Sequence, residues 1–337
     1  MSAEPKPALG GNVLVVDDEA SFRRLLRELL TMQGFRVHEA GSGEDALAIL
    51  AERPIDVVLL DLNMDGMSGH EVLTWIRADK ATAFIPVVMI TGGATTEEKL
   101  RALEEGVTDF LAKPFKTEEL LARVRSSVQM KRATDALEDA ENVIIALAKV
   151  IDARDPYTCF HSDRVSWYAG HLGEAIGLRG NELDAVRKGG LFHDLGKVAV
   201  SDGVLLKPGR LTPEEMAQMK RHPVEGRRLL AGMKSLSYAL DVVYHHHERS
   251  DGSGYPCGLS GEEIPLVARV TTIADIYDAL TTARVYRAAL TPEEALGIMK
   301  NEAEKGWWDA RLLEAFRGVL SKVPDSLAPE SLGRTRT

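Results

Sequence analysis

The chain has 337 residues, of which 45% are hydrophobic and 27% are charged, and this length suits about two domains with separate cores. Its net charge of −10 and pI near 5.5 argue against a general nucleic-acid-binding protein, and no apolar run is long enough to cross a membrane. The N-terminus lacks a signal-peptide core, and Cys159 and Cys257 are isolated in the sequence. We therefore expect a cytoplasmic protein with neither a disulfide framework nor a thiolate zinc site.

The first 125 residues alternate short apolar runs with amphipathic stretches. The predicted strands are 13–16, 36–39, 57–60, 87–90 and 109–112, and the predicted helices begin near Ala20, Gly43, Gly69, Thr96 and Thr117. Such βα units, with continuous Val, Leu and Ile in the strands, predict a doubly wound parallel sheet with helices on both faces.

Polar side chains follow the ends of several predicted strands. They are Asp17 and Asp18, Asp61, Thr91 and Lys113. Ligands of open parallel sheets gather beyond the carboxyl ends of the strands. Three carboxylates meeting there would repel one another unless a hard cation such as Mg²⁺ lay between them. The alternative is that these carboxylates only cap strand ends.

Residues 11–128 resemble the receiver domain of two-component response regulators, through the segments VLVVDDE, LLDLNMDGMSG, MITGG and DFLAKPF. The resemblance implies that Asp61 accepts a phosphoryl group from a histidine kinase. It also implies that Mg²⁺ is held by Asp17, Asp18 and the Asn63 main chain, that Lys113 pairs with the phosphate, and that Thr91 and Phe110 form a switch pair.

The stretch 129–154 has no proline and predicts a helical linker. Apolar or small residues recur at spacings of three and four, at Met130, Ala133, Leu137, Ala140, Ile144, Leu147 and Ile151. This heptad seam favours a parallel coiled coil, so that two copies of the chain would dimerise through residues 130–151. The alternative is that the seam packs within its own chain.

From residue 155 onward the pattern is helical. The predicted helices are 161–177, 181–195, 213–232, 236–248, 263–280, 292–303 and 309–322, and the glycine-rich stretch 248–265 predicts a loop. Histidines and aspartates recur at intervals of about one helix, as His161, His193, Asp194, His222, His246, His247 and Asp275. The pattern predicts an all-α bundle whose helices bring ligands to a common centre, and this set exceeds what a single divalent metal needs.

Residues 155–325 resemble the HD-GYP subgroup of the HD phosphohydrolase superfamily, through HSDRV, FHDLGKV, LLKPGRLT, HPVEG, HHERSDGSGYPCGLSGEEIP and ARVTTIADIYDALTTARVYR. The resemblance implies a phosphodiesterase that converts cyclic di-GMP to pGpG, with further degradation to GMP left open. It implies two divalent transition metals, Fe or Mn in preference to Zn, Ni or Co, and a GGDEF-type protein as a further partner.

The resemblance also assigns the residues of this site. Asp194 would bridge the metals, with His161, His193 and Asp275 completing one metal and His222, His246 and His247 the other. Lys197 would clamp phosphate or donate a proton, and Tyr255, Lys207 and Arg284 are the candidate substrate contacts.

Several neighbouring residues receive weaker assignments. Tyr157 stands where some family members carry a glutamate that helps bind a third metal, so we predict two metals. His171 and His245 are expected outside the ligand set. Glu248 and Asp251 could orient ligand histidines or stabilise the loop. Residues 326–337 are expected to form a flexible tail.

Other activities remain open at this stage. The second hypothesis is a nucleotidase or other phosphohydrolase of the HD superfamily, although simple nucleotidases lack the Gly254-Tyr255-Pro256 loop. The third is a catalytically silent adaptor that binds partners through the surface of this loop. An intact set of ligand residues argues against the adaptor.

Overall fold

The computed structural model describes residues 10–93, 95–154, 160–283 and 288–320. The chain divides between Ala140 and Glu141 into two compact units. In the described residues no helix is both long enough and apolar enough to span a membrane.

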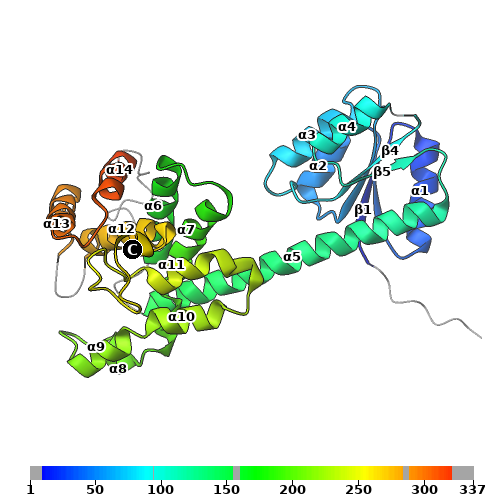
Figure 1. Cartoon of the computed structure of the whole chain (residues 1–337). Coiled ribbons are helices and arrows are strands. Elements are labelled where there is room, and N and C mark those ends of the chain that lie inside the picture. The colour runs from blue at the N-terminus through cyan, green and yellow to red at the C-terminus, as the bar shows by residue number, and fades with distance from the viewer. Residues whose placement is uncertain (1–9, 94, 155–159, 284–287, 321–337) are drawn as a thin grey trace, which may run out of the picture. The chain divides into compact units, whose positions relative to one another are not determined.

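The first unit is built on a parallel sheet of five strands in the order β2-β1-β3-β4-β5 (Figure 1). The strands are β1 Asn12–Val16, β2 Arg36–Ala40, β3 Val57–Asp61, β4 Val87–Thr91 and β5 Asp109–Ala112. The helices of this unit are α1 Ala20–Met32, α2 Gly43–Glu52, α3 Gly69–Ala78, α4 Thr96–Glu104 and the first part of α5 Thr117–Arg154. The predicted strands and helix starts are confirmed.

Helices cover both faces of this sheet, as the sequence predicts. Leu26 of α1 and Leu120 and Val124 of α5 pack with alternate strand residues on one face. Leu50 of α2, Val72 of α3 and Ala102 of α4 pack on the other face. Because both faces are buried, the strands need the continuous apolar runs that identified them.

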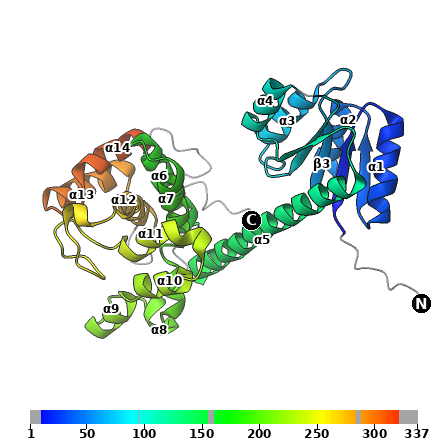
Figure 2. The same cartoon turned by 45° about the vertical axis from the view of Figure 1, so that its right-hand side comes forward.

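The second unit is helical (Figure 2). Its α-helices are α6 His161–Ala175, α7 Gly180–Phe192, α8 Asp202–Leu205, α9 Pro213–Met219, α10 His222–Leu230, α11 Leu240–His245, α12 Leu266–Thr281, α13 Pro292–Glu304 and α14 Ala310–Leu320. Its 3₁₀ helices are η1 Leu195–Ala199, η2 Lys234–Ala239 and η3 Gly261–Glu263. Helices α6, α12 and α14 share one apolar core.

The single helix predicted for 213–232 is wrong, because the structure has two helices there. The first ends at Met219, and the second begins at His222 with Pro223 in its first turn. Proline has no N–H to donate and its ring clashes with the preceding turn, so it belongs at a helix start. The break places His222 at a helix N-terminus.

Gly196 of η1 allows a close approach to that N-terminus. A Cβ atom at residue 196 would lie 1.8 Å from the His222 carbonyl oxygen. Only glycine therefore lets the turn that carries Asp194 pack directly on the start of α10.

Some residues of the predicted heptad seam are buried within the chain, and others are exposed. Ile151 is 6% exposed, and it packs with Ile144 and Ala148 of α5 on the helical unit's own core. Leu137 and Leu147, in contrast, are 58% and 53% exposed. Ile144 and Ile151 of the predicted seam are thus used within the chain, because α11 and η2 cover that side of the helix, whereas Leu147 stays exposed.

Candidate metal centre and phosphoacceptor site

Three carboxylates meet at the predicted edge of the parallel sheet. Single oxygens of Asp17, Asp18 and Asp61 all lie within 4.8 Å of one another. Lys113 Nζ lies 2.9 Å from Asp17 Oδ2 and 2.9 Å from Asp61 Oδ2. Burial raises the pKa of Asp17, and the hydrogen bond from Lys113 opposes that rise. The group therefore combines oxygen ligands suited to Mg²⁺ with a cation suited to phosphate.

The other expected receiver residues surround this edge. The main-chain N–H of Asn63 points to Asp61 Oδ1, with an N–O distance of 3.4 Å. Thr91 ends β4 and is buried, and its hydroxyl accepts a hydrogen bond from the Gly93 N–H. Phe110 is partly buried on the neighbouring strand β5. The geometry leaves the switch roles of Thr91 and Phe110 as predictions.

In the helical unit, five segments of the chain bring the predicted ligands together. His161 begins α6, Asp275 lies in α12, and His222 begins α10. His193 and Asp194 directly follow α7, and His246 and His247 directly follow α11.

Asp194 is common to two groups of ligand atoms. One group is His161, His193 and Asp194, and the other is Asp194, His222, His246 and His247. Asp194 Oδ2 lies 3.4 Å from His193 Nε2, whereas Asp194 Oδ1 lies 3.3 Å from His222 Nε2. Each carboxylate oxygen thus faces a different group, as a bridge between two metal ions requires.

Asp275 completes the first group. Its Oδ1 atom lies 3.3 Å from His161 Nε2 and 3.9 Å from His193 Nε2. The seven predicted ligand residues therefore surround one centre built around Asp194.

The histidine tautomers fit a metal centre. The Nδ1 atoms of His193, His222 and His246 each face backbone carbonyl oxygens, of Gly190, Met219 and Val243 respectively, at 2.8 to 3.0 Å. A carbonyl oxygen only accepts, so each Nδ1 carries a proton, and the Nε2 atom of a neutral ring then presents its lone pair to the centre.

These lone pairs face one another inside the bundle. His222 Nε2 and His246 Nε2 are 3.2 Å apart, and burial lowers the pKa of His222 to about 4. At neutral pH neither Nε2 atom then carries a proton with which it could form a hydrogen bond to the other. Two buried lone pairs at this distance repel each other unless a cation lies between them, so the donor set fits divalent metal ions.

His161 differs in its partners. Burial would lower its pKa, but hydrogen bonds with Asp275 and Asp278 raise the pKa of His161 to about 10. Its Nδ1 atom lies 2.6 Å from Asp278 Oδ2, which leaves Nε2 directed at the centre. A carboxylate on the far nitrogen orients a ligand histidine and makes it a stronger base.

Asp278, Arg164 and Asp152 also lie around this centre and were not predicted from the sequence. Arg164 Nε lies 2.5 Å from Asp278 Oδ1, and both side chains are almost fully buried. Asp152 in the last turns of α5 is also buried, and its Oδ2 accepts a hydrogen bond from the Ser162 N–H at 3.0 Å. Asp275 and Asp278 are three residues apart on one helix face, which is the one sequence signal that could have identified Asp278.

Lys197 lies beside the bridging carboxylate. Its Nζ atom is 2.5 Å from Asp194 Oδ2. Burial would raise the pKa of Asp194, but the charge of Lys197 helps to hold that pKa well below its usual range. The ammonium group therefore keeps Asp194 ionised and lies within reach of any group bound at Asp194.

The glycine-rich loop packs against the second group. The Tyr255 ring lies 4.7 Å from the His247 ring, and the Tyr255 N–H donates to the His247 carbonyl oxygen at 3.2 Å. Glu248 is buried and accepts from the Cys257 and Leu259 N–H groups at 2.7 and 3.1 Å. Of the two roles left open for Glu248, these contacts support stabilisation of the loop, and Asp251 likewise accepts from the Ser253 N–H.

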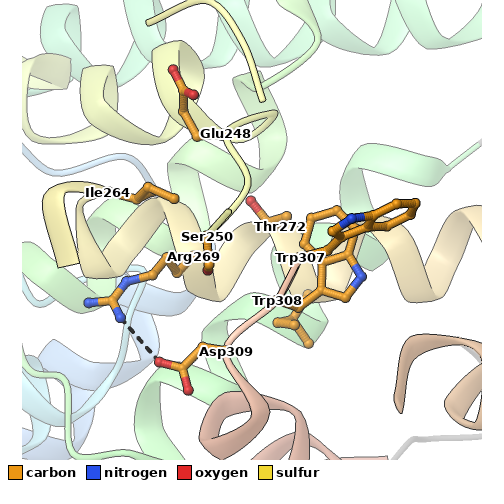
Figure 3. A pocket seen from close by; sticks show the side chains of 9 residues that line it. Glu248, Ser250, Ile264, Arg269, Thr272, Trp307, Trp308 and Asp309 are labelled. Carbon is orange, nitrogen blue, oxygen red and sulfur yellow. Dashed lines mark hydrogen bonds and ion pairs between the residues drawn. The ribbon is translucent and has the colours of Figure 1, made fainter. Parts of the chain in front are cut away.

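Two tryptophans support the base of this loop (Figure 3). The Ser250 N–H donates to the Trp307 carbonyl oxygen at 3.0 Å, and the Arg249 guanidinium lies 4.1 Å from the Trp307 ring centre. The small cavity beside them, whose lining includes Trp308, has a volume of about 10 Å³, which is room for roughly one water molecule. A larger cavity of about 110 Å³ is lined by His222 and Arg221, and is the better placed of the two for a ligand.

Of four other residues named from the sequence, two make contacts outside the ligand groups and two lie outside the described residues. Lys207 Nζ pairs with Glu215 Oε2 at 2.6 Å, and His171 stacks on Trp167. Arg284 and Tyr157 lie outside the described residues.

Comparisons with known proteins agree with the division of the chain into a receiver unit and a helical unit. Residues 13–125 match the response regulator receiver domain, and residues 146–312 match the HD domain. The cyclic di-GMP phosphodiesterase response regulator RpfG of Xanthomonas campestris is 36% identical over 335 residues, covering 92% of this chain and 88% of that protein. The chain belongs to this family of cyclic di-GMP phosphodiesterase response regulators.

Two other relatives show the range of the family. A cyclic di-GMP phosphodiesterase of Thermotoga maritima is 30% identical, covering 93% of this chain and 91% of that protein. A 3'3'-cGAMP-specific phosphodiesterase of Vibrio cholerae is 34% identical over 203 residues, covering 59% of this chain and 44% of that protein. As a response regulator with an HD domain, the chain is a metal-dependent phosphodiesterase, and its receiver implies a kinase partner.

We predict that Asp278→Asn weakens metal retention roughly 10- to 100-fold, because the amide no longer orients His161 as a carboxylate does. Metal content after dialysis against a chelator measures this change. Arg164→Gln is the matched control, since it removes the same ion pair and leaves the Asp278 carboxylate on His161. Equal metal loss in both variants would contradict an orienting role and indicate a folding defect.

Proposed function

We propose that the helical domain of this response regulator hydrolyses cyclic di-GMP to linear pGpG at the centre around Asp194. The single observation that carries the proposal is the convergence of two histidine groups on opposite oxygens of one buried carboxylate. Relatives aligned over nine-tenths of the chain bear the name cyclic di-GMP phosphodiesterase, which supports the choice of substrate.

The geometry of the two groups supports the ligand assignment implied by the sequence. His161, His193 and Asp275 would hold one ion, and His222, His246 and His247 the other, with Asp194 between them. Nitrogen-rich sets with carboxylates suit Fe or Mn, and also accept Zn, Ni or Co. Two such ions would lower the pKa of a bound water molecule and neutralise charge on the phosphate oxygens.

The protein's own residues would complete the reaction. Hydrolysis adds a water oxygen to phosphorus, breaks the bond to the ribose 3' oxygen and returns a proton to that oxygen. Lys197 carries a proton next to Asp194, and could donate it to the leaving oxygen. The Tyr255 ring lies 4.7 Å from the His247 ring and 5.0 Å from Lys220 Nζ, and an aromatic ring beside the centre suits contact with a guanine base. Further degradation to GMP remains open.

We predict that the protein reconstituted with Mn²⁺ or Fe²⁺ converts cyclic di-GMP to pGpG. His193→Ala and Asp194→Ala should lower the rate by about a thousandfold or more, because each removes a ligand of the centre. Chromatography of the products measures the rate. His171→Ala is the control, since that ring stacks on Trp167 and belongs to neither ligand group.

The substrate panel separates the competing functions. Cyclic di-GMP, 3'3'-cGAMP and linear dinucleotides should be assayed side by side. Cleavage of linear dinucleotides alone would indicate a nucleotidase of the HD superfamily. A metal-loaded protein that cleaves none of them would indicate a silent adaptor. Full activity of Asp194→Ala would contradict the assignment of the centre, and a metal content of three ions per chain would contradict the two-metal prediction.

The receiver would control this activity through phosphorylation of Asp61. Its carboxylate oxygen would take the phosphoryl group, Lys113 would neutralise the product, and Mg²⁺ would bind to Asp17, Asp18 and the Asn63 main chain. The contacts of Lys113 with both Asp17 and Asp61 support these roles. The direction of the effect on hydrolysis remains open.

We predict that Asp61→Asn abolishes labelling by radioactive acetyl phosphate, because a neutral amide is not a nucleophile toward phosphorus. The hydrolysis rate of this variant should not respond to the phosphodonor, whereas the rate of the wild-type protein should. Asp65→Asn is the matched control, since that exposed carboxylate lies outside the Asp17, Asp18 and Asp61 group. Labelling that survives in Asp61→Asn would identify a different acceptor.

We also propose that the chain forms a homodimer through α5, with a revised seam. Exposed small and apolar residues recur at spacings of four and three, at Ala136, Ala140, Val143, Leu147 and Val150. This stripe remains available because Ile144 and Ile151 pack inside their own chain. A heptad stripe is self-complementary, so a second copy of the same helix fits it.

Sedimentation velocity tests the dimer. Leu147→Lys should convert a dimer to monomers, because it places charge in the seam. Asn142→Lys adds the same charge to an exposed position of α5 off the stripe and should leave the dimer intact. A monomeric wild-type protein would contradict the proposal. The GGDEF-type partner and the cytoplasmic location stay predictions from sequence.

A further inference from the structure

We propose that His245, Glu248 and Cys257 form a second kind of metal site, for a thiophilic divalent ion such as Zn²⁺. One nitrogen of His245, one oxygen of Glu248 and the Cys257 sulfur all lie within 4.8 Å of one another. This group shares no residue with the two groups around Asp194. The proposal does not depend on the hydrolytic activity.

The first argument is an unsatisfied nitrogen. His245 Nδ1 is buried and has no hydrogen-bond partner among the described residues. Glu248 Oε1 lies 3.8 Å away, which is too long for a hydrogen bond. A buried polar atom without a partner is unfavourable, and a metal ion bound between these side chains would satisfy it.

The second argument is the chemistry of the donors. Imidazole nitrogen, carboxylate oxygen and thiolate sulfur together form a set that zinc accepts. The charges of a Glu248 carboxylate and a Cys257 thiolate would balance one divalent ion. Asp241 lies one turn before His245 on α11, so its carboxylate is on the same helix face and could supply a fourth ligand.

The surroundings hold the sulfur in place and leave it accessible. Cys257 is exposed, so an ion can enter from solvent. The Cys257 N–H donates to Glu248 Oε1 at 2.7 Å, which fixes the backbone that carries the sulfur. The sequence alone did not predict a thiolate site, because Cys257 is isolated in the sequence. Only the fold brings His245 and Glu248 close to Cys257.

An ion in this site would join the end of α11 to the loop that carries Tyr255. Glu248 already supports that loop through its bonds to the Cys257 and Leu259 N–H groups. Metal binding would add a direct link from His245 to Cys257, one residue beyond the Gly254-Tyr255-Pro256 triplet. The site would therefore restrict the motion of the loop.

Cobalt absorption tests the proposal in the reduced full-length protein already loaded with Mn²⁺. Added Co²⁺ should give a thiolate-to-cobalt charge-transfer band in the near ultraviolet, which the nitrogen and oxygen ligands around Asp194 cannot produce. Cys257→Ser should abolish the band. Cys159→Ser removes the other thiol of the chain and should keep it. His245→Gln should weaken cobalt binding by at least about tenfold, by loss of one ligand.

Two outcomes would overturn the proposal. One is a wild-type protein with no charge-transfer band at stoichiometric Co²⁺. The other is loss of the band in Cys159→Ser together with its survival in Cys257→Ser. Hydrolysis is not the readout, so failure of the phosphodiesterase proposal would leave the band unaffected.

Discussion

The helical domain depends on one buried carboxylate. Asp194 lies between His193 and His222, with an oxygen directed at each, and Lys197 keeps it ionised. Desolvating a charge of this kind is costly unless partners surround it. The arrangement of α7, α10 and η1, including the close approach that Gly196 permits, supplies those partners.

The receiver also buries carboxylates, but a lysine side chain lies between two of them. Asp17 and Asp61 are buried at a sheet edge, and Lys113 makes hydrogen bonds of 2.9 Å with both. The lysine reduces the repulsion between the two carboxylates. In the helical domain Lys197 lies beside the carboxylate, and the neutral histidines His222 and His246 direct lone pairs toward the centre, as divalent metal ions require.

Sequence reasoning predicted the elements and most of the site because both depend on local patterns. Buried parallel strands require continuous apolar runs, and the starts of α1 to α5 follow from the same alternation. Failures occurred where packing between distant segments decides the outcome. The register of the α5 seam depends on which face α11 and η2 cover, and this cannot be read from spacing alone. Asp278 was missed because its role exists only through His161, which is 117 residues away in the chain. Pro223 could have predicted the break before His222, because proline lacks the N–H that a continuous helix needs. The prediction followed the helical spacing of the apolar residues instead.

The hydrogen bond between Asp152 and Ser162 has a thermodynamic consequence. Helix α5 begins in the receiver, and Asp152 near its end accepts from the Ser162 N–H in the first turn of α6, whose first residue is His161. If metal ions bind to His161, the stability of the last turns of α5 and the occupancy of the centre would be linked, and linkage is reciprocal. Metal binding would then slow hydrogen exchange in those turns, and fraying of the turns would weaken metal binding by the same free energy.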